Sequence, residues 1–242
     1  MNLPDSRLRL CGSTLVARVR ARAFVVLSTM AAGVVAIALY HAGRTHFLTG
    51  IILGLTLAHG IVADDLRSGT LILWLQKPRS PAGLYLERVA GVTIAVWGAH
   101  ALVLLMALAL APSSPAVQRT LVQLPAGMAL DLATVAVAFG WSSLGLRPEL
   151  IPTLLVIVVL GALGSDAVTA PETMGRWAPF LAAQRFPFRE AYLLSAWLAG
   201  SGPPPTGIAC VRLVLYPAVW IGFGSLIVGL RARRPQLFAE ED

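Results

Sequence analysis

Long apolar stretches alternate with short polar ones along most of the chain. Runs of about twenty apolar residues recur, and a helix of that length crosses roughly 30 Å of hydrocarbon. Six membrane spans are predicted, at residues 23–42, 47–63, 89–111, 121–141, 150–164 and 208–230. The pattern therefore predicts an all-α integral membrane protein in which residues 1–242 form a single transmembrane domain.

Two segments outside these spans have the pattern of helices that lie at the membrane surface. Residues 13–22 alternate apolar residues with Arg18, Arg20 and Arg22, which predicts an interfacial elbow helix with its arginines near lipid head groups. Residues 165–207 combine aromatic residues with several prolines. This composition is typical of re-entrant or interfacial helices anchored by aromatic rings, here between the fifth and sixth spans.

The longest polar interruption in the first half of the chain is residues 64–88. Asp64 and Asp65 end an apolar run, and the following Arg-Ser-Gly sequence predicts a turn. Thr70 can then cap a short amphipathic helix, which Pro78 ends. A loop that merely rests at the lipid interface is the simpler interpretation of this segment.

A second helix is predicted to start directly after this segment. Ser80 and Pro81 are the residue types favoured at the N-cap and at the first helical position. The new helix should therefore begin there and continue into the third span.

The order of residue types in this segment resembles the coupling-helix region of ABC-2-type permeases, the membrane subunits of many bacterial exporters. Pro81 stands where that family usually has a basic residue. The residues that carry the resemblance are Asp65, Arg67, Gly69, Thr70, Leu71, Leu75, Pro78, Ser80 and Arg88.

The second span carries a stripe of small residues. Gly50, Gly54 and Ala58 recur at every fourth position, which predicts close packing with another helix.

The resemblance implies a permease subunit of an ATP-binding-cassette exporter that moves an amphipathic or lipid-like substrate. It implies a cytosolic P-loop ATPase as partner, which would carry ATP and Mg, and a second copy of this chain or a related permease. It also implies a multi-pass protein of the bacterial cytoplasmic membrane. The residues expected to contact the ATPase are Asp65, Arg67, Gly69, Thr70, Leu71, Trp74, Leu75, Lys77, Pro78 and Arg79.

Charge agrees with a membrane protein whose termini are both cytosolic. Of the 19 Lys and Arg residues, six fall in segments expected outside and the other 13 in segments expected inside, as the positive-inside rule requires. The net charge of +7 is spread over short loops, so nucleic-acid binding is not expected. The outer six are Arg44, Arg119, Arg176, Arg185, Arg189 and Arg212.

Candidate chemistry is sparse. The single lysine, Lys77, lacks the glycine-rich context of a phosphate-binding loop, so any ATP hydrolysis is expected on another chain. No motif favours an enzyme. Cys11 and Cys210 fall on opposite sides of the membrane and lack metal-ligand spacing, so neither a disulfide nor a metal site is expected.

Three ionisable residues lie within predicted spans, where such groups are costly and often functional. His100 and Asp131 fall near the middle of consecutive antiparallel spans, so we expect them at similar depth and joined by a hydrogen bond. The pair is either a structural clasp or part of a proton relay or substrate contact. His59 lies one turn from the cytosolic end of its span and is expected to be interior or interfacial.

A different class of function fits the same pattern. The chain could be a non-transporting scaffold within a larger membrane complex, which would co-purify with that complex and without an ATPase. A secondary transporter is disfavoured because neither an inverted repeat nor a matched pair of broken helices is visible.

Overall fold

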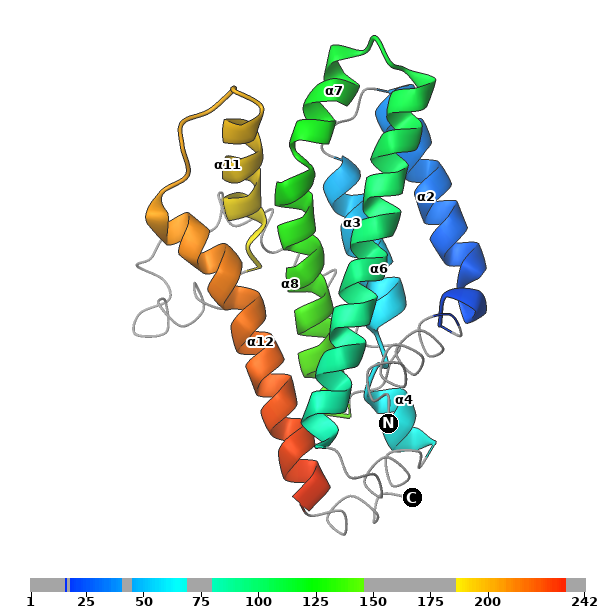
Figure 1. Ribbon diagram of the computed structural model, residues 1–242, viewed down its shortest axis with the longest axis vertical. Helices are drawn as coiled ribbons and strands as arrows, with labels where there is room; N and C mark the ends of the chain where they lie inside the picture. The colour runs from blue at the N-terminus through cyan, green and yellow to red at the C-terminus, as the bar shows by residue number, and fades with distance from the viewer. Residues whose placement is uncertain (1–15, 17, 41–44, 69–79, 146–185, 234–242) are drawn as a thin grey trace, which may run out of the picture.

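The computed structural model describes residues 16, 18–40, 45–68, 80–145 and 186–233, and no strand occurs among them. They form a bundle of long helices with short helices near its two ends (Figure 1). In chain order the helices are α2 (Ala23–Ala38), α3 (Thr45–Ala58), α4 (Ala63–Arg67), α6 (Pro81–Leu110), α7 (Pro115–Val122), α8 (Leu124–Ser143), α11 (Phe188–Leu198) and α12 (Gly207–Arg233).

Four helical segments are long and apolar enough to cross a membrane: His46–Arg67, Pro81–Leu110, Leu124–Ser143 and Gly207–Arg233. Many large apolar side chains on the outside of the bundle are exposed, among them Phe24, Ile94 and Val214. A soluble protein rarely exposes so much apolar surface. Together these features indicate a membrane protein.

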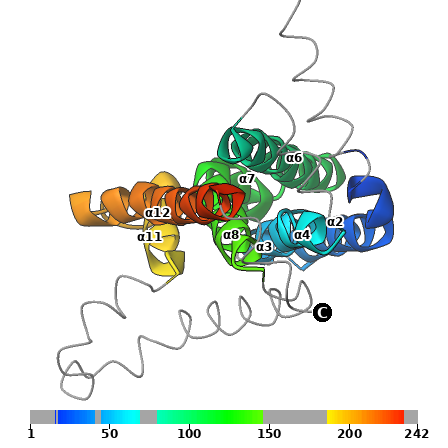
Figure 2. The ribbon, with the colours of Figure 1, turned by 90° about the horizontal axis from the view of Figure 1, so that it is seen from below.

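Helix α8 lies at the centre of the bundle. It packs against α12 on one side and against α3 and α6 on the other (Figure 2). Its middle is apolar around most of its circumference, and Leu130, Val135 and Phe139 are fully buried in the main core. A helix that is apolar on all faces is expected to be enclosed in this way.

The first expected span is shorter than predicted. Helix α2 covers 16 residues and ends at Ala38, with Leu39 as its C-cap. At about 1.5 Å per residue it is short for a complete crossing. Residues 41–44, and the fifth expected span at 150–164, lie outside the described residues.

The helix that leads into the third expected span begins where it was predicted to begin, but the segment after that span differs from the prediction. The Ser80 side chain accepts a hydrogen bond from the Gly83 amide, and Pro81 opens α6. The predicted loop at 112–120 is wrong, because residues from Pro115 onward form α7. Proline is well suited to the first turn of a helix, where its missing N–H is not needed.

Gly50 and Gly54 of the small-residue stripe on α3 pack closely against another helix, as predicted, and that helix is α8. A Cβ atom added at Gly50 would lie 2.0 Å from Asp131 Oδ1, and one at Gly54 would lie 3.1 Å from Thr134 Cγ2. The absence of side chains at these two positions therefore lets α3 approach α8 closely.

The second expected span is interrupted near its end. Helix α3 stops at Ala58, and the chain turns at Gly60, whose φ of 70° is in the left-handed region. The short helix α4 follows. Glycine adopts this conformation without the steric cost that other residues incur, so Gly60 determines where the helix breaks.

Gly60→Ala is expected to destabilise the protein by about 1–2 kcal/mol, because a left-handed backbone is strained for alanine. The added Cβ would also lie 2.4 Å from Asp64 Oδ1 and displace that carboxylate. The midpoint of thermal unfolding in detergent measures the loss. An unchanged midpoint would contradict the assigned role of Gly60.

Helices α8 and α12 run in the same direction, from the α7 end of the bundle to the α4 end (Figure 1). The short helix α11 packs against both of them near the α7 end. It lies within residues 165–207, where interfacial or re-entrant helices are expected. The rest of that segment up to residue 185 lies outside the described residues.

Candidate functional site

The residues around α4 form the end of the bundle next to the predicted coupling segment. We call Arg18, Arg22, Asp64, Asp65, Tyr85 and Arg88 the junction cluster. They come from the residues before α2, from α4 and from the first turns of α6. The junction cluster therefore connects three parts of the chain next to the two ends of the described segments that flank residues 69–79.

Asp65 is the centre of one half of the junction cluster. Its Oδ2 atom pairs with the Arg88 guanidinium and accepts a hydrogen bond of 2.7 Å from the Tyr85 hydroxyl. Arg88 is 8% exposed and Tyr85 is fully buried. A buried arginine needs a charged partner, so this ion pair fixes α4 against α6.

Asp64 joins α4 to the residues that precede α2. It pairs with Arg18 at 3.4 Å and with Arg22 at 3.9 Å. The two guanidinium groups also donate to backbone carbonyls at the end of α3, at Leu57, His59 and Gly60 for Arg18 and at Thr56 and His59 for Arg22. The prediction that these two arginines face lipid head groups is wrong.

Arg18 and Arg22 contact the end of α3 because a broken helix exposes carbonyl oxygens that lack intrahelical partners. Cationic side chains satisfy these oxygens and favour the negative end of the helix dipole. Burial lowers the pKa of Arg18 and Arg22 from its ordinary value, and the charge of Asp64 opposes this shift. Arginine remains protonated over the physiological range, so both side chains act as permanent cations.

Helix α8 contributes a contact that the sequence pattern does not predict. The Ser142 hydroxyl accepts hydrogen bonds of 2.9 Å from the Val62 and Ala63 amides, which begin α4. These amides have no partner within the short helix itself. A serine at the end of an apolar span is a weak sequence signal, because the local pattern does not indicate which residue it contacts.

The described part of the predicted ATPase contact consists of Asp65 and Arg67. Asp65 lies in the junction cluster, whereas Arg67 is exposed at the end of α4. The other predicted contact residues lie outside the described residues: Gly69, Thr70, Leu71, Trp74, Leu75, Lys77, Pro78 and Arg79.

The predicted hydrogen bond between His100 and Asp131 is confirmed. Nδ1 of His100 lies 2.8 Å from Oδ2 of Asp131, and both side chains are fully buried. The pair lies nearer the α7 end than expected, because α6 begins at Pro81 and ends at Leu110. The third predicted polar residue, His59, is half-buried at the helix break, and its ring contacts the Leu55 carbonyl.

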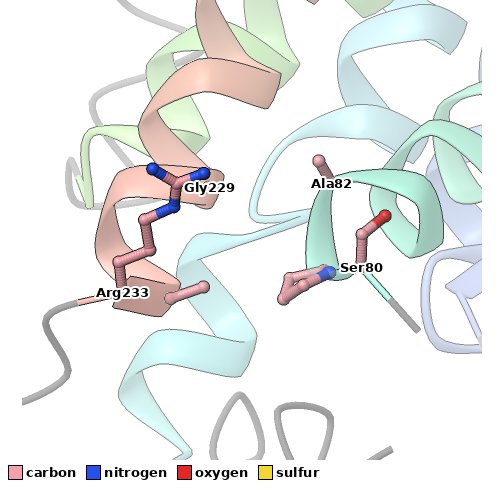
Figure 3. Close-up of a pocket in the computed structure, with 6 residues that line it drawn as sticks. Ser80, Ala82, Gly229 and Arg233 are labelled. Carbon is pink, nitrogen blue, oxygen red and sulfur yellow. The ribbon is translucent and has the colours of Figure 1, made fainter. Parts of the chain in front are cut away.

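A hollow of ≈ 440 Å³ lies between the start of α6 and the end of α12. Ser80 and Ala82 line one wall, and Gly229 and Arg233 line the other (Figure 3). Near the opposite end, the buried carboxylate of Glu190 on α11 pairs with Arg212 on α12. The described part of the chain has no group of three or more His, Cys, Asp or Glu residues placed to hold a metal ion.

Comparison with known proteins assigns no family. No protein-family model, curated protein or solved structure matches this chain.

Proposed function

We propose that this chain is the membrane-spanning subunit of an ATP-binding-cassette exporter of the ABC-2 type. A separate cytosolic P-loop ATPase, which carries ATP and Mg, would drive it. A second copy or a related permease would complete the path, and the cargo would be amphipathic or lipid-like. The protein would belong to the bacterial cytoplasmic membrane, with both termini in the cytosol.

The observation that carries this proposal is the Asp65–Arg88 ion pair. Both residues belong to the sequence pattern that resembles the coupling region, and they lie on either side of its central segment. Because they pair, α4 and the start of α6, which flank that segment in the chain, are joined to each other. A force applied to the segment would therefore act on α4 and α6 together.

The direction of the helices supports a six-span arrangement. Helices α8 and α12 both run towards the α4 end, so the chain between them has to return to the α7 end. The apolar residues 150–164 are long enough to contribute most of that return as a fifth span. In this arrangement α11 would be the described part of the re-entrant region.

The decisive experiment is co-purification of the ATPase with the full chain carrying Trp74→Ala. A large aromatic side chain in a partner's groove usually contributes much of the binding energy, so we expect loss of the ATPase or of the coupling between hydrolysis and transport. Trp197→Ala, at an exposed tryptophan on α11, is the matched control and should retain the ATPase. Retained partner and transport in Trp74→Ala, or a host complex without any ATPase, would overturn the proposal.

A further inference from the structure

The His100–Asp131 pair has unused polar atoms that a purely structural clasp does not explain. Asp131 Oδ1 and His100 Nε2 are buried without a hydrogen-bond partner among the described residues. Buried polar atoms without partners are costly, and native proteins usually satisfy them. Each unsatisfied atom is a place where a proton can be held or passed on.

Glycine backbone closes the pair on two sides. A Cβ atom at Gly50 would lie 2.0 Å from Asp131 Oδ1, and one at Gly127 would lie 2.6 Å from His100 Cε1. The main chain of α3 and of α8 therefore lies directly against the carboxylate and the ring. A lipid head group or a sugar would not fit on these sides, whereas a proton needs no additional volume.

A third titratable side chain continues the pair towards the end of the bundle. His46 is fully buried at the second position of α3, and its ring centroid lies 5.5 Å from that of His100. A histidine ring can accept a proton on one nitrogen and release it from the other. The order His46, His100, Asp131 thus leads inward from the α7 end.

Among the described residues, the helices packed around this site bring few other charges to it. Helix α2 has no titratable residue. On α7, Arg119 is exposed, and on α11 the Glu190 carboxylate pairs with Arg212 of α12.

We infer that His46, His100 and Asp131 form an enclosed proton-binding site that exchanges with the membrane side at which α3 begins. A proton passed from His46 to His100 Nε2 is balanced by movement of the Nδ1 proton to Asp131 Oδ2. The pair then gains one proton and loses its negative charge, and no electron is transferred. A buried carboxylate with one oxygen left unsatisfied is unfavourable, so occupancy of the site stabilises the folded bundle.

The test uses the full chain in lipid nanodiscs without an ATPase, so its result does not depend on the proposed function. The chain has four histidines, so ¹⁵N-histidine resonances can be assigned by single substitutions. Between about pH 5 and 8 we expect the His100 ring signals and an infrared band of the Asp131 carboxyl group to change together. Asp131→Asn should remove both changes while the bundle stays folded.

The route is tested by a rapid pH change. His46→Gln should slow the response of His100 by about a hundredfold, as expected for loss of a proton donor. His59→Gln, at the other end of α3, is the control and should leave the rate unchanged. An unchanged rate in His46→Gln would overturn the route.

If the wild-type His100 and Asp131 signals stay constant throughout that pH range, the pair is only a structural clasp. This measurement needs no variant of the pair, so it decides the proposal even if Asp131→Asn fails to fold.

Discussion

Gly50→Ala is expected to destabilise the bundle by about 3 kcal/mol or more, towards the upper end of overpacking effects. The new methyl group would overlap the Asp131 carboxylate, with 2.0 Å between Cβ and Oδ1 and 2.8 Å to His100 Nδ1. Either α3 moves away from α8, or the His100–Asp131 hydrogen bond breaks inside the core. Unfolding by titration with denaturing detergent, followed by circular dichroism, measures the loss.

Gly98→Ala is the matched control. Gly98 also lies within a long apolar helix, and a Cβ atom added there meets nothing within 4 Å. Alanine favours the helix over glycine, so this variant should be as stable as the wild type or more stable by about 0.5–1 kcal/mol. Equal stability of the two variants would contradict the close packing of α3 on α8.

Arg88→Met is expected to cost about 3–5 kcal/mol, because removal of one member of a buried ion pair leaves the other charge poorly compensated. Asp65 would retain the Tyr85 hydroxyl but lose the neighbouring guanidinium. Methionine keeps most of the apolar stem of arginine, so the loss reports charge more than volume. The same detergent titration measures this loss of stability.

A double-mutant cycle separates the coupling between Asp65 and Arg88 from destabilisation that does not depend on their pairing. Asp65→Asn combined with Arg88→Met should be more stable than Arg88→Met alone, because the carboxylate charge that lost its guanidinium partner is gone. Arg233→Met changes an exposed arginine at the same end and should stay within about 0.5 kcal/mol of the wild type. Strictly additive losses would indicate that Asp65 and Arg88 are not coupled.

Local sequence signals predicted several parts of this structure well. Helix α12 matches the sixth expected span closely, and the start of α6 follows from Ser80 and Pro81. The hydrogen bond between His100 and Asp131 was predictable because two polar residues in consecutive apolar helices gain most by meeting each other.

Other features depend on residues far apart in the chain and have no local signature. Arg18 contacts carbonyls about forty residues later, and Ser142 contacts amides 79 and 80 residues earlier. A membrane protein also presents apolar residues both to lipid and to its own core. Hydropathy therefore located α8 but did not indicate that it is the central helix.

The contacts of Arg18 and Arg22 with the end of α3 have a consequence for how the protein is assembled. Synthesis proceeds from the N-terminus, so both arginines are made before the carbonyls of Thr56, His59 and Gly60. Those carbonyls become available only when α3 has formed and broken at Gly60. The two guanidinium groups must therefore remain hydrated until α3 is inserted, and their docking then joins α2 and α3 as a hairpin.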